Sequence, residues 1–185
     1  IFGEESVAAQ ASLYALNLSV GLRDQTKKKV VMVDVAGPEP HQGVSVMPPG
    51  GEIFFMDKGL ATLDEASQKI TRYAGGVDIL RSSAPGHGPL DASIVTSLLT
   101  LLVNDYHYVL ILLSSRLGDG VFKVLAQTDT VHLILEPRPD AFKRMMQLLV
   151  DSGVWSDQEL KKQIKPIILE TPHAHGHGVR LAWAL

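Results

Sequence analysis

The most constraining feature of this chain is the unbroken apolar run at residues 109–113, within the segment Tyr-His-Tyr-Val-Leu-Ile-Leu-Leu-Ser-Ser. Five consecutive apolar residues are too few for a helix, and without polar alternation they predict a strand that is buried on both faces. Such strands lie in the middle of parallel sheets, and ligands of these folds bind at the carboxyl ends of the strands. Here that end is Leu112-Leu113-Ser114-Ser115, which offers no acid and no strong metal ligand.

The rest of the chain alternates between strand patterns and helix patterns. Further strands are predicted at residues 30–35, 77–80, 131–135 and 164–169, and residues 53–56 are expected to form a short strand or a loop anchor. Helices are predicted at residues 7–22, from Thr62 or Asp64 to Tyr73 before Gly75-Gly76, from the cap Asp91 through Leu102, and at 119–127 and 140–150. This ordering predicts a three-layer α/β sandwich with a mainly parallel sheet. Pro166 indicates that its strand starts there or lies at the sheet edge.

Composition limits the classes of function. The 185 residues, 45% hydrophobic and 20% charged, predict one globular domain spanning 1–185. A net charge of −3 gives no general attraction to nucleic acid or anionic membranes, and Lys27-Lys28-Lys29 is expected to be a solvated turn. The absence of cysteine excludes disulfides, thiolate metal sites and a cysteine nucleophile. Because Ile1-Phe2-Gly3 has the pattern of a strand end, we expect the chain to be excised from a longer one.

A strand ending in Gly3, a loop, a buried helix and a second strand ending in Asp34 form the layout of a phosphate-binding domain. The segments that match a known family are residues 1–3, 15–18, 31–34, 76–80, 84–85, 106–111, 128–131 and 135–137. In this order they resemble the MinD/ParA family of deviant P-loop ATPases, and within it the CpaE/TadZ type associated with pilus assembly. The resemblance covers nearly the whole chain and implies a P-loop NTPase-like fold that dimerises across its nucleotide face.

The chemistry of that family depends on three features, and this chain departs from each. Residues 4–12, Glu-Glu-Ser-Val-Ala-Ala-Gln-Ala-Ser, contain no glycine, lysine or arginine to close on a phosphate, and leave only Ser12 as a hydroxyl on the metal side. Asp34 keeps the first acid of the family's Asp-x-Asp, but Ala36 replaces the second. Leu112 takes the place of the acid that holds the Mg²⁺ shell. Positioning and electrostatics are nearly the whole of phosphoryl transfer, so these losses predict a pseudo-ATPase.

The predicted function is therefore a noncatalytic scaffold or localisation module with no catalytic residue and no cofactor. Gly3, Ser12 and Asp34 would mark a vestigial nucleotide site, although an acid such as Asp34 at a strand end often caps a neighbouring loop. We expect this face to be filled by Val7, Ala8, Ala9, Leu112 and Leu113. The resemblance implies a homodimer in the cytoplasm, held near the inner membrane by other proteins of a pilus or secretion assembly machine, without nucleic acid.

Two alternatives remain open from the sequence. His173, His175 and His177 would share one face of a strand and reach one Zn²⁺ or Ni²⁺, giving a metal-dependent hydrolase or transferase with Asp34 or Glu170. The interleaved glycines instead favour a loop that binds metal adventitiously. The other alternative is a domain that binds a nucleotide without hydrolysing it.

One further histidine, His132, lies inside an apolar strand and is expected to be a hydrogen-bonded core residue. Ser114-Ser115 lack the Gly-x-Ser-x-Gly elbow of a serine nucleophile.

Overall fold

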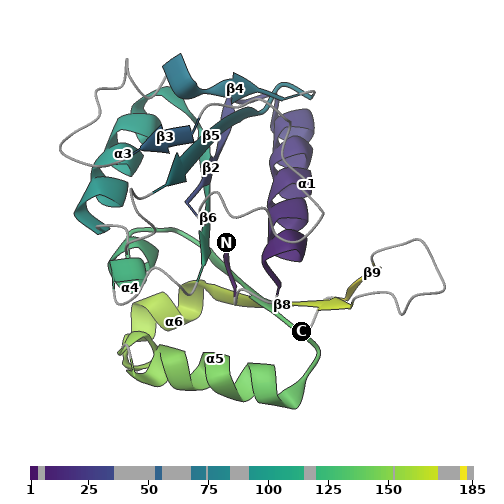
Figure 1. Cartoon of the computed structure of the whole chain (residues 1–185), viewed down its shortest axis with the longest axis vertical. Helices are drawn as coiled ribbons and strands as arrows, with labels where there is room; N and C mark the ends of the chain where they lie inside the picture. The colour runs from purple at the N-terminus through teal and green to yellow at the C-terminus, as the bar shows by residue number, and fades with distance from the viewer. Residues whose placement is uncertain are drawn as a thin grey trace.

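The computed structural model describes residues 1–3, 7–35, 53–55, 68–73, 75–83, 92–114, 120–151, 153–170 and 180–182. In chain order its strands are β1 (Phe2–Gly3), β2 (Val30–Asp34), β3 (Ile53–Phe55), β4 (Thr71–Arg72), β5 (Asp78–Ser83), β6 (Tyr108–Ser114), β7 (Val131–Leu135), β8 (Ile164–Glu170) and β9 (Arg180–Ala182). The helices are α1 (Ala8–Thr26), α3 (Ala92–Asp105), α4 (Gly120–Leu125), α5 (Pro139–Asp151) and α6 (Gln158–Gln163), with a short 3-10 helix η4 (Val154–Ser156). The described strands form one nine-stranded sheet (Figure 1).

The sheet is mainly parallel, as the sequence predicts. Its order is β3-β5-β2-β6-β1-β7-β8-β9, and among the described strands only β4, paired with β5, and β9, paired with β8, run antiparallel. The apolar run at 109–113 lies in the central strand β6, between β2 and β1. The register places Leu112 beside Asp34 and Ser114 beside Gly3, so the carboxyl ends of three strands meet at one edge.

Helices cover both faces of the sheet, because the central strands carry apolar side chains on both sides. Val31 and Val33 of β2 face the core shared with α3, α4, α5 and α6, whereas Val30 and Met32 face α1. Figure 1 shows α1 on one side of the sheet and α3 and α4 on the other. The predicted three-layer α/β architecture is confirmed.

Helix α1 is longer than the sequence pattern indicates, because Gly21 does not end it. The helix closes at Lys27, which has a left-handed φ of 59° and donates its backbone N–H to the carbonyl of Arg23 at 2.9 Å. A glycine in a helix interior costs only about 1 kcal/mol, which tertiary packing overrides. Lys27, Lys28 and Lys29 are exposed between α1 and β2, as predicted for a solvated turn.

The helix predicted to end at Tyr73 is wrong at its C-terminal end. Residues 62–67 lie outside the described residues, but the chain at Thr71 forms β4, antiparallel to β5. Gly75 and Gly76 have φ of +98° and +76°, a left-handed conformation that favours glycine, and they form the turn between the two strands. The glycine pair therefore belongs to a hairpin and not to a helix end.

A buried carboxylate at the start of β5 holds this hairpin to the sheet. Asp78 is 7% exposed and accepts hydrogen bonds from the Arg72 guanidinium at 2.7 and 2.9 Å and from the Tyr106 hydroxyl at 3.0 Å. Burial and the neighbouring charge of Asp78 raise the pKa of Tyr106, so this hydroxyl keeps its proton. The cluster joins β4 and β5 to the segment that leads into β6.

Four further details concern the short elements η4 and α6, the start of α3, the exposure of α5 and the position of Pro166. The short elements η4 and α6 were not predicted; α6 begins at Asp157, whose carboxylate accepts hydrogen bonds from the N–H groups of Glu159 and Leu160. Asp91, the predicted cap of α3, lies outside the described residues. Phe142 of α5 is half exposed, whereas Met145 and Leu149 of the same helix are buried in the core. Pro166 lies in β8 beyond the part that β9 pairs with, in agreement with an edge position.

Candidate functional site

The carboxyl ends of β1, β2 and β6 and the start of α1 meet where the sequence predicts a vestigial nucleotide site. Gly3 ends β1 and Ala8 begins α1, so only residues 4–7 connect the strand to the helix. A phosphate loop of the G-x-x-x-x-G-K-[ST] type uses about eight residues, whose backbone N–H groups close around the phosphates. Here the helix has begun within the stretch that would form such a loop.

The side chain of Val7 fills the junction between strand and helix. A Cβ placed on Gly3 would come 3.1 Å from Cγ2 of Val7 and 3.3 Å from Cβ of Ile134. Val7 is 3% exposed and packs in the same apolar cluster as Leu112 and Ile134. The floor of this edge is therefore apolar at the position where a phosphate-binding fold keeps its backbone open.

The other apolar residues expected at this face divide between the two cores. Ala8 is buried and Ala9 is half buried. Leu113 was expected beside Leu112, but it packs in the opposite core with Phe2, because successive residues of a strand point to opposite faces.

Ser12 lies in the second turn of α1 and not at the mouth of a loop. Its Oγ donates a hydrogen bond to the carbonyl oxygen of Ala8 at 2.9 Å, and the residue is 8% exposed. This bond to the carbonyl four residues earlier is the usual way in which a serine is satisfied inside a helix. The Ser12 hydroxyl is therefore bonded to the backbone of its own helix. Ser19 is bonded in the same way, because its Oγ donates to the carbonyl oxygen of Ala15 at 2.7 Å.

Asp34 ends β2 and is 8% exposed. Its register neighbours are Leu112 of β6 and Arg81 of β5, and the N–H of Val35 donates to the carbonyl of Leu112 at 3.0 Å. Within the part of the chain that the structure describes, no group of three or more histidine, aspartate or glutamate side chains is arranged to hold a metal ion. His173, His175 and His177 lie outside that part.

Two arginines lie just beyond the carboxyl end of β7, and both are paired with acids. Arg138 binds Asp140 through two hydrogen bonds of 3.2 and 2.6 Å and lies 3.7 Å from Glu136, while Arg144 donates to Asp140 at 3.0 Å. The hydrogen bonds from Arg138 and then Arg144 hold the pKa of Asp140 well below its usual range. The sequence analysis missed this cluster, although the spacing of four residues between Asp140 and Arg144 is a signal for such a pair.

His132 is a hydrogen-bonded core residue, as the sequence predicts, and its partner comes from α1. The hydroxyl of Tyr14 lies 2.8 Å from Nδ1 of His132. Burial lowers the pKa of His132 and raises the pKa of Tyr14, so both stay neutral near pH 7. The pair fastens α1 to β7.

The described residues of this edge supply few ligands for a magnesium nucleotide. Val7 covers the backbone at Gly3, the Ser12 hydroxyl is bonded to Ala8, and Leu112 stands beside Asp34 where a second carboxylate would be needed. The aliphatic side chains of Val7 and Leu112 are buried in the core at this edge and offer no ligand to a metal ion or a phosphate.

The architecture is nonetheless that of a known group of ATPases. No family model and no curated protein matches the chain. Its fold is similar to the crystal structure of a ParA family ATPase from Chlorobium tepidum TLS, with a TM-score of 0.58 and 14% sequence identity over 90% of this chain and 72% of that one. It is also similar to a chain of the MinC:MinD cell division protein complex from Aquifex aeolicus, with a TM-score of 0.55 and 14% identity over 90% of this chain and 66% of that one.

These similarities define the fold class: an α/β domain with the mainly parallel sheet of the ParA/MinD P-loop structures. At 14% identity they establish the fold alone. None of the described helices combines the length and hydropathy needed to cross a lipid bilayer.

Proposed function

We propose that this chain is a noncatalytic scaffold or localisation module built on the ParA/MinD fold, a pseudo-ATPase of the CpaE/TadZ type. Its work would be to bind other proteins of a membrane-associated assembly machine, such as one that builds a pilus. The observation that carries this proposal is the Val7 side chain, which packs onto Gly3 where phosphate oxygens would have to approach the backbone.

The electrostatics of the edge support the proposal. Phosphoryl transfer depends on cations placed against the transferred group, and binding a triphosphate also requires them. Residues 4–12 contain no lysine or arginine. Arg138 and Arg144, which lie beyond β7, are already neutralised by Asp140 and Glu136.

The same features suit an edge that meets another protein. Val7, Leu112 and Ile134 are buried beneath this edge and give it an apolar interior without a bound ion. We infer that a second copy of the chain covers this edge, as the resemblance to dimerising ATPases implies, and that this pairing needs no nucleotide.

Isothermal titration calorimetry with Mg-ATP and with Zn²⁺ tests the proposal, with an active ParA-type ATPase as the positive control for nucleotide. We expect no binding heat from either ligand and no release of phosphate above the buffer rate. Micromolar binding of Mg-ATP without turnover would replace the proposal with a nucleotide-binding domain. Tight zinc binding that disappears when His173, His175 and His177 become alanine would replace it with a metal-dependent enzyme.

A further inference from the structure

Helix α5 carries more apolar surface than its place on the sheet requires. Ala141, Met145 and Leu149 face the core and are at most 2% exposed. The neighbouring row at the same spacing consists of Phe142, Met146 and Val150, which we call the α5 stripe. Phe142 is 50% and Val150 51% exposed. An apolar arc of about 100° is enough to seat a helix on a core. Met146 is partly buried and packs against that core, whereas Phe142 and Val150 on either side of it leave about half of their surface exposed.

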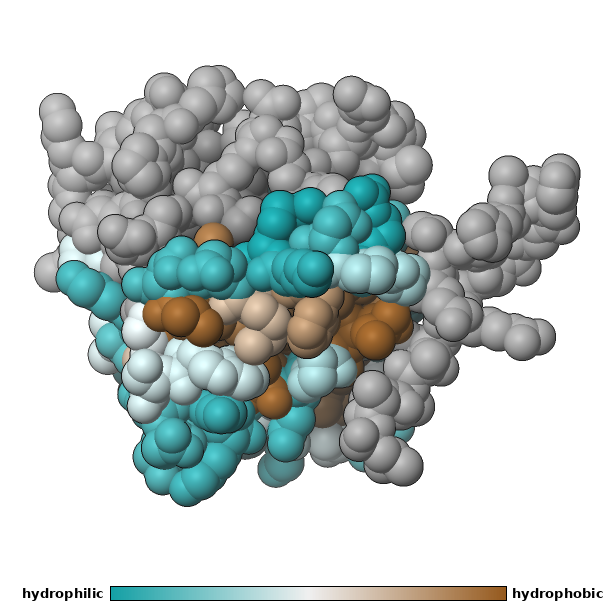
Figure 2. All heavy atoms as spheres, turned by 90° about the horizontal axis from the view of Figure 1, so that it is seen from below, coloured by the Kyte–Doolittle hydropathy of each residue, from teal (hydrophilic) through white to brown (hydrophobic). Residues whose placement is uncertain are grey.

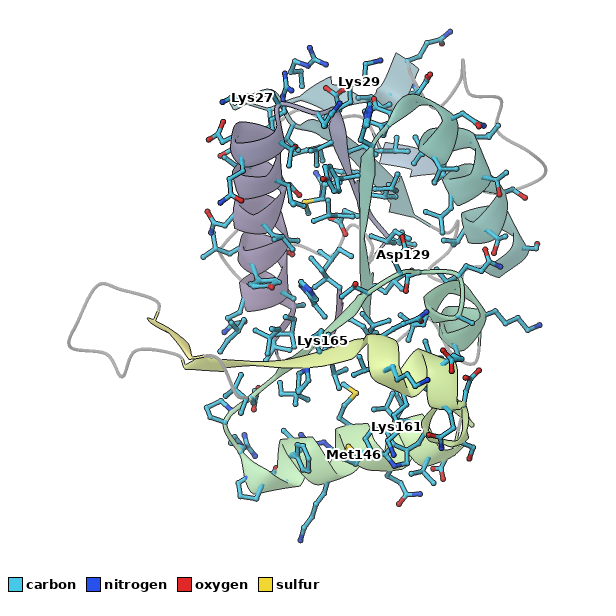
Figure 3. All side chains as sticks on the ribbon, turned by 180° about the vertical axis from the view of Figure 1, so that it is seen from behind. Lys27, Lys29, Asp129, Met146, Lys161 and Lys165 are labelled. Carbon is cyan, nitrogen blue, oxygen red and sulfur yellow. The ribbon has the colours of Figure 1, made fainter. Side chains whose placement is uncertain are left out.

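The α5 stripe is a cluster and not scattered exposure. Among the described residues four large apolar side chains are exposed, and two of them are Phe142 and Val150; the others, Leu13 and Val103, lie on different helices. Figure 2, which looks at the molecule from the α5 side, shows an apolar band that crosses this face between more polar rows. Figure 3 shows Met146 at the opposite end of the molecule from Lys27 and Lys29.

Charges along the border of the α5 stripe run from basic to acidic. The adjacent row of the helix contains Lys143 near its start, Gln147 in the middle and Asp151 at its end. Gln147 donates to Asp151 at 2.6 Å, and Asp151 remains exposed. Within the described part of the chain, Lys143 forms no ion pair. A surface with a cation at one end and an anion at the other is complementary to the same surface of a second copy that is rotated by a two-fold axis.

We propose that the α5 stripe is a self-association surface, onto which α5 of a second copy packs antiparallel across a two-fold axis. Antiparallel packing sets Phe142 against Val150 of the partner subunit. It also brings Lys143 close to Asp151 of the partner subunit, and the two-fold axis repeats each contact. A parallel arrangement would instead place like charges side by side, which is unfavourable. This surface goes beyond the proposed function, since it is separate from the edge at Gly3 and does not depend on the state of that edge.

The size of the surface sets the strength of the pairing. The 13 residues of α5 span about 20 Å, and one pair of such helices buries less than the roughly 1,200 Å² of a standard stable interface. The association is therefore weak and concentration-dependent. The association becomes significant when the local concentration of the protein is high.

Sedimentation velocity from low to high micromolar concentration tests the proposal. For the wild type we expect the mass to double as the concentration rises, from one chain to two, or from two to four where the edge at Gly3 already joins a pair. F142E and V150E are each expected to abolish this step, because both side chains are exposed and their replacement leaves the core intact. V103E is the matched control on α3 and is expected to leave the step unchanged.

A charge exchange tests the antiparallel arrangement. K143E and D151K are each expected to weaken the association by about tenfold, because each replaces two attractions with two repulsions. The double variant K143E/D151K is expected to restore wild-type association. The proposal is overturned if the wild type shows no concentration-dependent step, if V103E affects the step as much as V150E, or if the double variant remains as weak as the single ones. The calorimetric test of the proposed function is independent of all these outcomes.

Discussion

Cγ2 of Val7 lies so close to Gly3 that a Cβ added to Gly3 would come within 3.1 Å of it. Gly3→Ala is therefore expected to lower the free energy of unfolding by about 1–3 kcal/mol, the usual effect of overpacking a buried site. Val7→Ala removes the obstructing methyl groups, so the double variant is expected to lose less stability than the two single losses added together. Urea denaturation of the four proteins measures this coupling.

Gly21→Ala is the matched control for that experiment. Nothing lies within 4 Å of a Cβ at Gly21, and the residue is inside α1, so alanine is expected to stabilise the protein by about 0.5–1 kcal/mol. If Gly3→Ala were as harmless as Gly21→Ala, the description of the junction as filled by Val7 would be wrong.

Ser12→Ala separates a structural serine from one that binds metal. The hydroxyl of Ser12 bonds only to its own helix at Ala8 among the described contacts, and alanine is the better helix former. We expect the free energy of unfolding to change by no more than about 0.5 kcal/mol. We also expect calorimetry to detect no binding of Mg-ATP. A nucleotide affinity that the wild type has and this variant lacks would restore Ser12 as a metal ligand.

The Tyr14–His132 pair gives the fold an acid-sensitive contact. Burial lowers the pKa of His132 in the folded protein, so between that value and the unfolded value of about 6.5 the unfolded chain binds more protons. The contribution of this group to stability is therefore complete above about pH 6.5 and declines as the pH falls through the folded pKa.

Unfolding free energies measured from pH 8 down to pH 5 in His132→Gln and in the wild type check this expectation. The variant is expected to lose stability at neutral pH through its weaker packing, but its stability should vary less between pH 6.5 and pH 5. If the unfolding free energies of the two proteins varied with pH in parallel, the assignment of this pH dependence to His132 would be wrong. His107, which is exposed, provides the control variant His107→Gln.

The hydroxyl of Tyr106 is one of three groups that donate hydrogen bonds to Asp78. The substitution Tyr106→Phe removes only this donor. The expected loss is about 1 kcal/mol, since Asp78 keeps its two hydrogen bonds from Arg72. Tyr108→Phe is the control, because the Tyr108 hydroxyl has no hydrogen-bond partner among the described residues. Equal effects of the two variants in chemical denaturation would show that the hydrogen bond from Tyr106 to Asp78 contributes nothing to stability.

The sequence predicts those parts of the fold that depend on local pattern. The apolar run at 109–113 is enough to identify a strand with helices on both sides, and the polar interruption at His132 is enough to predict a core hydrogen bond. Neither pattern predicts which residues come into contact in the folded protein. Tyr14 is separated from His132 by most of the chain, and only the order of strands in the sheet brings α1 and β7 together.

The errors of the prediction have the same origin. Gly75-Gly76 ends a helix or turns a hairpin equally well, and the choice is made by the pairing of Arg72 with Asp78 across the hairpin. At the candidate site, the absence of lysine and glycine from residues 4–12 is visible in the sequence. Val7 is among the side chains that the sequence predicts at this face, but the packing of Leu113 in the opposite core was not predicted, because it follows from the pairing of β6 in the sheet.

The position of β1 fixes an order of events during synthesis on the ribosome. Phe2 pairs with Leu113 on one side and Leu133 on the other, so β1 has no partner strand until β6 has been made, and it gains its second partner only with β7. The backbone hydrogen bonds of helix α1 lie within its own residues, so this helix can form before β1 is paired. The two halves of the sheet are thus joined late, through β1, and until then an apolar strand is open to capture by a chaperone.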